Sequence, residues 1–221
     1  MSIVVDDALR VRFPGLDALP RHIEGVRVTE SSPTLVERRR AVVEMALRKY
    51  DLESLKDGTT FRAYRDFFWR IGIDPTKNRP AAEALIRRIL AGKPLPAINS
   101  LVDAYNLASI ETEIALAAFD SGKVHGTLNM RSAKGGEEFY GIGMAKPLRL
   151  TGGEIVIVDS ERLVAVYPHR DAQHSRVAFE TKSVLLLACG VPSIDKKDLD
   201  KALNVATAYI MEACGGAMKA R

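Results

Sequence analysis

Before residue 95, the apolar positions recur mainly every three or four residues, a spacing that is typical of helices with one buried face. Ser32-Pro33 offers a helix N-cap followed by proline at the first helical position, and Gly92 offers a helix end. The pattern therefore predicts three helices, which run from Ser32 to about Tyr50, from Thr60 to Ile71, and from Pro80 to Gly92.

The first 30 residues show a different pattern, in which short apolar runs are separated by proline and glycine. These runs predict three strands, over residues 3–5, 10–13 and 23–28. Pro14-Gly15 and Pro20 predict the turns that connect them.

After residue 120 the pattern becomes that of β-structure. An apolar run predicts a strand over 124–130. Further on, two apolar runs predict a hairpin, with strands over 154–158 and 163–167 and a turn over 159–162. The last periodic segment, 195–214, predicts an amphipathic helix.

Between these two halves lies an apolar stretch, 96–120, that carries a stripe of polar residues. Asn99 and Asp103 are four residues apart and Asp103 and Asn106 three apart, so a helix places all three on one face. Buried amides and carboxylates need hydrogen-bond partners. The stripe can therefore cap neighbouring loops and stabilise the fold, or it can form the wall of a functional pocket.

The composition is that of an ordinary globular protein: 47% of the 221 residues are apolar and 27% are charged. No run of about 20 apolar residues is present, which predicts no membrane span, and the first residues do not resemble a secretory signal. Cys189 and Cys214 lack metal-ligand spacing and predict buried thiols. A reducing, cytoplasmic location is expected.

The net charge is +4, and basic residues concentrate in one segment, 62–93. This segment contains eight basic and three acidic residues, interleaved with aromatic rings. Phosphates bind such charges and bases stack on such rings, so the segment is a candidate RNA-binding surface. The alternative is that the rings belong to the core and the arginines flank it. The RNA-binding candidates are Lys77, Arg79, Arg87 and Arg88.

Several residues of the polar stretch fall at the spacing of a known motif. They are Asn99, Val102, Asp103, Asn106, Glu111, Ala118, Phe119 and Asp120. At these positions the stretch resembles the editing and tRNA-binding domain (B modules three and four) of the phenylalanyl-tRNA synthetase beta chain. That family has the pattern N-x-x-V-D-x-T-N-Y, then a glutamate, then G-Q-P-x-H-A-F-D.

Two later segments extend the resemblance, which covers about 95–216. The matching residues are Arg131, Ala133, Gly136 and Glu137 in one segment, and His174, Ser175, Val177, Glu180, Thr181, Val184, Leu185 and Leu186 in the other. The helical segment before residue 95 resembles the helical lead-in of free-standing members of the family, and residues 1–94 match only that looser pattern. The resemblance implies an α+β fold, with a mixed, mostly antiparallel sheet and packed helices, formed by 1–221 as a single domain.

The resemblance also implies a function: trans-editing hydrolysis of misacylated aminoacyl-tRNA, by an ester hydrolase rather than a complete tRNA ligase. The expected partners are tRNA and the amino-acid moiety that it carries, with no metal and no cofactor. The expected catalytic residues are Asn106, Asp103 and Gln173. The expected substrate-binding residues are Asn99, Tyr105, Asp120, Arg131, Glu137, His174 and Thr181.

At three positions this chain departs from the family pattern. The family threonine aligns with Tyr105 and the family histidine with Ala117. A family glutamate aligns with either Gln173 or Leu187, and neither is acidic. Alanine and leucine cannot transfer a proton, so a second hypothesis stays open: an RNA- or amino-acid-binding module that has kept the fold and lost the chemistry.

Overall fold

The computed structural model describes residues 3–219, and most of its strands belong to two sheets. The first sheet contains, in spatial order, β11 (Ala217–Met218), β2 (Asp17–Glu24), β10 (Ser183–Gly190) and β3 (Leu116–Asp120). The second contains β1 (Ile3–Val5), β4 (Leu128–Ser132), β7 (Ile155–Val158), β8 (Leu163–Val166) and β9 (Arg170–Asp171). β1 pairs parallel with β4, and the other neighbours in both sheets are antiparallel.

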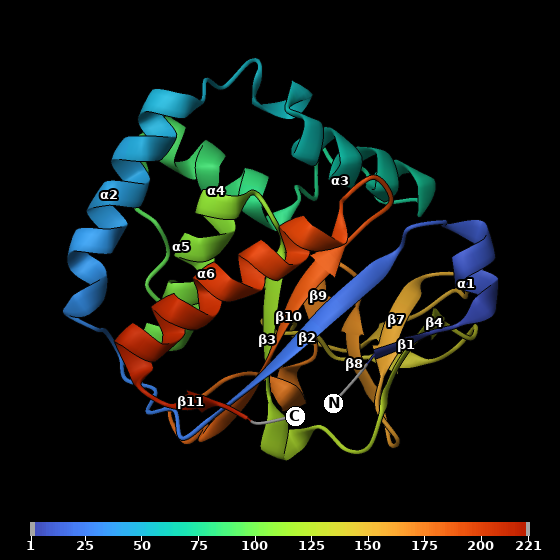
Figure 1. Ribbon diagram of the computed structural model, residues 1–221. Helices are drawn as coiled ribbons and strands as arrows, with labels where there is room; N and C mark the ends of the chain where they lie inside the picture. Colours follow the sequence, from blue (N-terminus) through green and yellow to red (C-terminus); the bar gives the residue numbers. More distant parts are fainter. Residues whose placement is uncertain (1–2, 220–221) are drawn as a thin grey trace.

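Four of the helices gather on the side of the first sheet that faces away from the second sheet (Figure 1). They are α2 (Thr34–Lys49), α4 (Ala81–Leu90), α5 (Ser100–Thr112) and α6 (Lys196–Cys214). The other two are α1 (Asp7–Arg12) and α3 (Thr59–Arg70), and short 3-10 turns occupy Leu55–Asp57, Ser121–Lys123 and Gln173–Ser175. Within residues 3–219, no helix combines the length and the apolar character that crossing a membrane requires.

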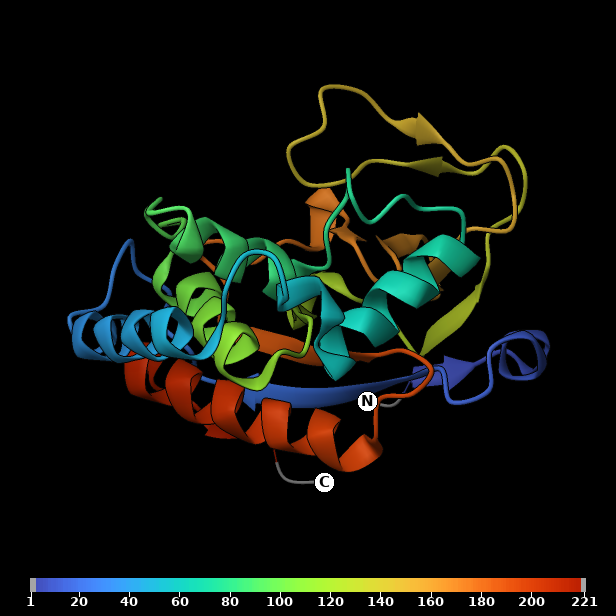
Figure 2. The ribbon, with the colours of Figure 1, turned by 90° about the horizontal axis from the view of Figure 1, so that it is seen from above.

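A small third sheet projects from the body of the molecule, as Figure 2 shows. It pairs β5 (Glu138–Phe139) with β6 (Leu148–Arg149). Its base is attached to the second sheet by a small apolar cluster that includes Phe139, Leu150 and Val156. The sheet is therefore anchored at one end and exposed along the connection between its strands.

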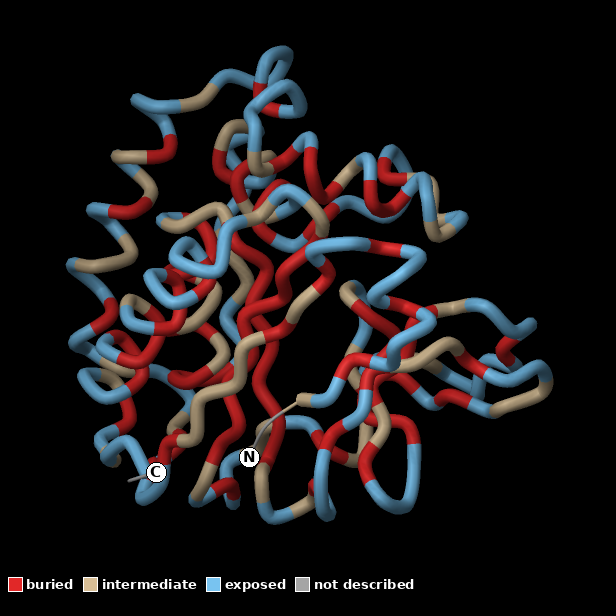
Figure 3. The backbone as a smooth tube through the Cα atoms, turned by 45° about the vertical axis from the view of Figure 1, so that its right-hand side comes forward, coloured by how far each residue is buried: buried red, intermediate tan, exposed pale blue. Residues whose placement is uncertain are grey.

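Strand β10 explains how the layers are held together, because both of its faces are buried (Figure 3). Val184, Leu186 and Ala188 pack into the core beneath the helices. The alternate residues, 185, 187 and 189, pack into a second core between the two sheets. Side chains alternate across a strand, so one apolar run supplies two cores.

Helix α3 closes one end of this second core with Tyr64, Phe67 and Phe68. The Tyr64 hydroxyl donates a hydrogen bond to the Cys189 carbonyl at 2.6 Å and accepts one from the Ala115 amide at 3.1 Å. Three of the rings in the basic segment are thus core residues, while Trp69 is 57% exposed.

The structure confirms the α+β class and the predicted helices, with ends that differ by one or two residues. The predicted hairpin is confirmed as β7 and β8, and Asp159 holds its turn by accepting hydrogen bonds from the amides of Glu161 and Arg162 at 2.8 Å. The strand predicted over 124–130 begins later, at Leu128.

The strand predicted over 10–13 is wrong, because this segment is the end of helix α1. The Asp6 side chain caps that helix by accepting a hydrogen bond from the Ala8 amide at 2.9 Å. Leu9 and Phe13, four residues apart, are both buried on one helical face. The local alternation of apolar and basic residues concealed this longer period.

The turn predicted at Pro20 is also wrong, since strand β2 runs through it. Pro20 pairs with Leu187 of β10, whereas β11 reaches only Ile23 and Glu24 on the other side of β2. At Pro20 that side therefore needs no amide donor, and proline is tolerated. The strand predicted over 23–28 correspondingly begins earlier and ends at Glu24.

Candidate functional site

The predicted polar stripe of helix α5 divides into two parts with different surroundings. The Asn99 side chain is the N-cap, and it accepts hydrogen bonds from the amides of Leu101 and Val102 at 3.1 and 2.9 Å. Such a cap satisfies amides that have no partner inside the helix.

The Asp103 carboxylate also holds this end of the helix. It accepts hydrogen bonds from the Ile98 amide at 3.0 Å and from the Arg39 guanidinium at 2.9 Å. Burial raises the pKa of Asp103, although Arg39 and the amide oppose that rise. Asn99 and Asp103 thus fix the entry to α5, and their predicted roles in substrate binding and catalysis stay predictions.

Tyr105 and Asn106 instead line a cavity of about 190 Å³, which we call the inner pocket. Its walls come from α5 and the start of α4, from β3 and β10 of the first sheet, and from β7, β8 and β9 of the second. The other wall residues are Ala81, Ala115, Leu116, Ala117, Phe119, Ile157, Ala165, Val166, Tyr167, Pro168, His169, Asp171, Leu187 and Cys189. Most of these side chains are apolar, so a polar group that faces the cavity meets few partners.

Asp171 is the one acidic residue in the wall of the inner pocket. It lies on β9, opposite Ala165 of β8, and its backbone carbonyl accepts a hydrogen bond from the Ile142 amide at 2.9 Å. Among residues 3–219, its carboxylate has no hydrogen-bond or ion-pair partner. The loss of water around the carboxylate raises the pKa of Asp171 to about 7.

Sequence reasoning missed Asp171 because it lies outside the matched motifs. It lies two residues before Gln173, one of the two candidate positions for the family glutamate. That proximity is the signal that could have drawn attention to it. Gln173 itself lies in a 3-10 turn and does not line the inner pocket. Its backbone amide donates a hydrogen bond to the Tyr140 carbonyl at 2.9 Å.

Besides Tyr105, two pocket positions at which this chain can depart from the family pattern are direct neighbours. Ala117 and Leu187 face each other across the β3–β10 pair and both line the inner pocket. This wall is therefore apolar where the family pattern has a histidine and, if Leu187 is the equivalent position, a glutamate. The carboxylate in the pocket wall belongs instead to Asp171, on β9 of the second sheet.

Other predicted site residues lie away from the inner pocket. The Thr181 hydroxyl donates to the Asp120 carboxylate at 2.8 Å, and the same carboxylate accepts from the Gly122 amide at 3.1 Å. This pair attaches the 178–181 loop to the end of β3. His174 has a buried Nε2 atom that lacks a hydrogen-bond partner in the described part of the chain.

Arg131 and Glu137 line a separate hollow of about 410 Å³, together with Asp159 and Arg162. The Arg131 guanidinium donates two hydrogen bonds to the Glu137 carboxylate, at 2.9 and 2.6 Å. This bidentate pairing lowers the pKa of Glu137 to about 2. The two side chains therefore satisfy each other's charge and hydrogen bonds. Their contact with a substrate stays a prediction.

The predicted RNA-binding residues differ in how freely they face solvent. Arg87 donates to the buried Glu83 carboxylate at 2.7 Å, and Arg65 joins it at 3.0 Å. Arg88 donates to the Pro94 carbonyl, whereas Lys77 and Arg79 are exposed. The Glu83 carboxylate therefore pairs with two arginines of the basic segment. RNA binding by the four predicted residues stays a prediction.

Comparison with known proteins gives a consistent result. The model of the family described as B3/4 domain matches residues 63–215. The phenylalanine–tRNA ligase beta subunit of Fusobacterium nucleatum is 32% identical over 90 residues, which are 40% of this chain and 11% of that protein. The beta subunit of Rhodopseudomonas palustris is 28% identical over 163 residues, 63% of this chain and 20% of that protein.

A solved structure supports the same fold. An N-terminal fragment of the phenylalanyl-tRNA synthetase beta subunit from Pyrococcus horikoshii superposes with a TM-score of 0.51 at 15% identity, covering 98% of this chain and 50% of that one. The chain thus spans only a small part of the length of these curated relatives.

Proposed function

This chain belongs to the B3/4 domain family, and from that premise we propose that it is an editing-type hydrolase of misacylated tRNA. In this proposal, the inner pocket receives the amino acid, and the bond that breaks is the ester between the amino acid and the terminal ribose. The observation that carries the proposal is an unpartnered carboxylate, Asp171, with a pKa of about 7 in the same cavity as Asn106. A protein that acts on charged tRNA is expected in the cytoplasm.

The size of the inner pocket supports an amino-acid ligand. Its volume of about 190 Å³ is somewhat larger than the roughly 150 Å³ of an engineered apolar cavity that admits benzene. A single side chain fits such a space, whereas a base with its sugar and phosphate does not. Alanines at 115, 117 and 165 leave the room that larger residues would fill.

A hydrolytic step can be written with the groups in the pocket. Asp171, in its charged form, accepts a proton from a water molecule as the water oxygen attacks the ester carbonyl carbon. The Asn106 amide donates a hydrogen bond to the oxyanion that forms. The ester C–O bond then breaks, and the ribose oxygen takes the proton back from Asp171. A general base works best when its pKa is near the working pH, which agrees with a value of about 7.

One observation favours the second candidate, a binding module without turnover. The pocket wall is apolar at Ala117, where the family pattern has a histidine, and at Leu187, one of the two candidate positions for the family glutamate. Without a proton acceptor, the pocket would hold an amino-acid side chain and leave the ester intact. The two candidates therefore differ in what Asp171 does.

A deacylation screen tests the proposal. Total tRNA is charged with a panel of cognate and near-cognate amino acids, and release is followed with catalytic amounts of protein. Selective release that disappears in Asp171→Asn, while Asp200→Asn behaves as wild type, supports the hydrolase. Asp200 is the matched control because it is an exposed aspartate of α6.

Absence of release for the whole panel, from protein that melts cooperatively, would rule out the hydrolase. Binding of charged tRNA under those conditions would establish the binding module instead. The Asn106→Ala variant adds a second check, because its rate should fall while its melting temperature is kept.

A further inference from the structure

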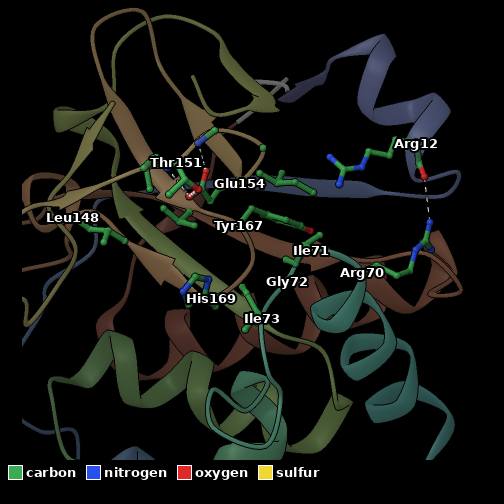
Figure 4. Close-up of a pocket in the computed structure, with 15 residues that line it drawn as sticks. Arg12, Arg70, Ile71, Gly72, Ile73, Leu148, Thr151, Glu154, Tyr167 and His169 are labelled. Atoms are coloured by element: carbon green, nitrogen blue, oxygen red, sulfur yellow. Dashed lines mark hydrogen bonds between the residues drawn. The ribbon is translucent and has the colours of Figure 1, made fainter. Parts of the chain in front are cut away.

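A further hollow, of about 490 Å³, adjoins the inner pocket, and we call it the arginine cleft (Figure 4). It lies between the end of α3 with the 71–73 segment on one side and the 148–155 segment on the other. Val166, Tyr167 and His169 line both hollows, so the 166–169 segment forms their common wall. The volume falls within the roughly 300–1,000 Å³ range of small-ligand sites.

Two arginines, Arg12 and Arg70, line the end of this cleft next to α1 and α3 (Figure 4). Each lies 4.9 Å from the centre of the same ring, Phe13, and Arg70 donates to the Arg12 carbonyl at 3.2 Å. Phe13 in turn packs edge-on against Phe67 at 5.3 Å. The buried Phe13 ring is thus a packing partner shared by both cations.

Neither arginine has a carboxylate partner among residues 3–219, unlike Arg39, Arg65 and Arg131. The acidic residue in the cleft wall is Glu154, and its carboxylate accepts hydrogen bonds from the amides of Thr151 and Gly152 at 2.9 Å. That carboxylate is therefore committed to its own turn. The positive charge of the two arginines is left to an external anion.

His169, in the common wall, does not add to this charge. Loss of hydration and the neighbouring Arg170 lower the pKa of His169 to about 4, so the ring is neutral at pH 7. It packs edge-on to Phe68 at 6.4 Å. Across the cleft, Leu148 is 50% exposed. The ring and this side chain offer apolar surface at the end of the cleft away from the two arginines (Figure 4), and an unstacked base requires such a surface.

We propose that the arginine cleft binds the single-stranded 3′ end of the RNA whose terminal aminoacyl ester enters the inner pocket, with Arg12 and Arg70 contacting its phosphates. This assignment rests on the proposed function, since that function places the ester in the neighbouring cavity. A guanidinium matches the geometry of a phosphate and remains charged at any physiological pH. The division agrees with the two volumes: the small cavity takes a side chain and the larger cleft takes nucleotide.

RNA binding is measured without chemistry, so that the outcome does not depend on hydrolysis. The probe is a fluorescent single-stranded tetranucleotide that ends in CCA and carries no amino acid, followed by anisotropy at several salt concentrations. For Arg12→Gln/Arg70→Gln we expect affinity to fall about 10- to 100-fold. The slope of log affinity against log salt should become shallower by roughly 1.4, or about 0.7 for each phosphate that an arginine no longer neutralises.

Three variants serve as controls. Arg48→Gln removes an exposed arginine of α2 and should leave binding unchanged. Arg12→Lys/Arg70→Lys keeps the charge and should recover most of the salt dependence, even if the loss of guanidinium packing on Phe13 lowers the melting temperature. Asp171→Asn should bind the probe at least as well as wild type, which separates binding from hydrolysis.

Equal affinity and equal salt slope for wild type and the double glutamine variant would overturn the assignment. Competition by an acidic peptide as effective as that by the RNA would also overturn it, because the cleft would then be a general anion site. If RNA binding depends on the arginines but no charged tRNA is hydrolysed, the cleft assignment stands and the hydrolase proposal fails.

Discussion

The inner pocket and the arginine cleft share the 166–169 segment but are built on opposite principles. The pocket is small and apolar, and its one carboxylate lacks a partner, so the pKa of Asp171 rises to about 7. The cleft is larger, and its two arginines are held against Phe13 without a carboxylate. A single wall thus separates a site suited to proton transfer from a site suited to anion binding.

The two hollows also differ in where their residues come from. The walls of the pocket lie within residues 63–215, the part that matches the B3/4 domain family. Arg12 of the cleft lies outside that part, on α1, whereas Arg70 of α3 lies inside it. In our interpretation, the apolar pocket follows the family fold, and the cleft also depends on the N-terminal segment of this chain.

The largest effect is expected for the carboxylate of the pocket. Asp171→Asn should lower the deacylation rate by about 10²- to 10⁴-fold, because an amide cannot accept the proton of the attacking water. Single-turnover kinetics with a substrate from the screen would measure it. Wild type should also gain activity as pH rises through about 7, where Asp171 becomes charged. A rate that does not change between pH 6 and pH 8 would contradict this role.

The next effect concerns the other polar group of the pocket, Asn106. Asn106→Ala should reduce the rate constant by about 10²-fold, the usual cost of removing one oxyanion donor. Affinity for the CCA probe should stay at the wild-type value, because Asn106 does not line the cleft. Weaker probe binding with an unchanged rate constant would instead assign Asn106 to RNA contact.

A third prediction uses stability to test the environment of Asp171. An aspartate in the unfolded chain has a pKa near 3.9, whereas that of Asp171 in the folded protein is about 7. The extra cost of folding a charged Asp171 therefore vanishes well below pH 4, grows as pH rises, and is complete above pH 7. Asp171→Asn should thus raise the free energy of unfolding at pH 8, by on the order of 2–4 kcal/mol.

Urea melts of both proteins at pH 4 and pH 8 measure this difference. The gain should be small at pH 4, about 0.5 kcal/mol, because the wild-type carboxyl is then protonated in the folded state and about half protonated in the unfolded state. An equal difference at the two pH values would show that the carboxyl is not destabilised by its surroundings. Its general-base role would then lose its physical support.

The smallest effect separates the two parts of the α5 stripe. Asn99→Ala removes the N-cap and should lower the free energy of unfolding by about 1 kcal/mol. Deacylation at a temperature well below the melting point should stay within twofold of wild type, because Asn99 does not line either hollow. A rate loss as large as that of Asn106→Ala would show that Asn99 also takes part in substrate binding.

The sequence by itself determined the local elements and the family. Caps and apolar periods placed helices α2, α3, α4 and α6 within one or two residues, and the Asp159 turn located the β7–β8 hairpin. The motif also identified Asn106, which does line the inner pocket. These features depend on neighbours along the chain, and sequence spacing records such neighbours directly.

Only the tertiary structure decided which polar residues meet. Asp171 acquires its high pKa from walls supplied by two sheets and α5, and no local motif encodes that burial. Arg12 and Arg70, 58 residues apart, converge because Phe13 is buried against α3. The polar stripe of α5 is divided because Asp103 meets Arg39 of α2 whereas Asn106 faces the pocket. Burial and pairing of this kind depend on long-range packing, so sequence spacing alone cannot express them.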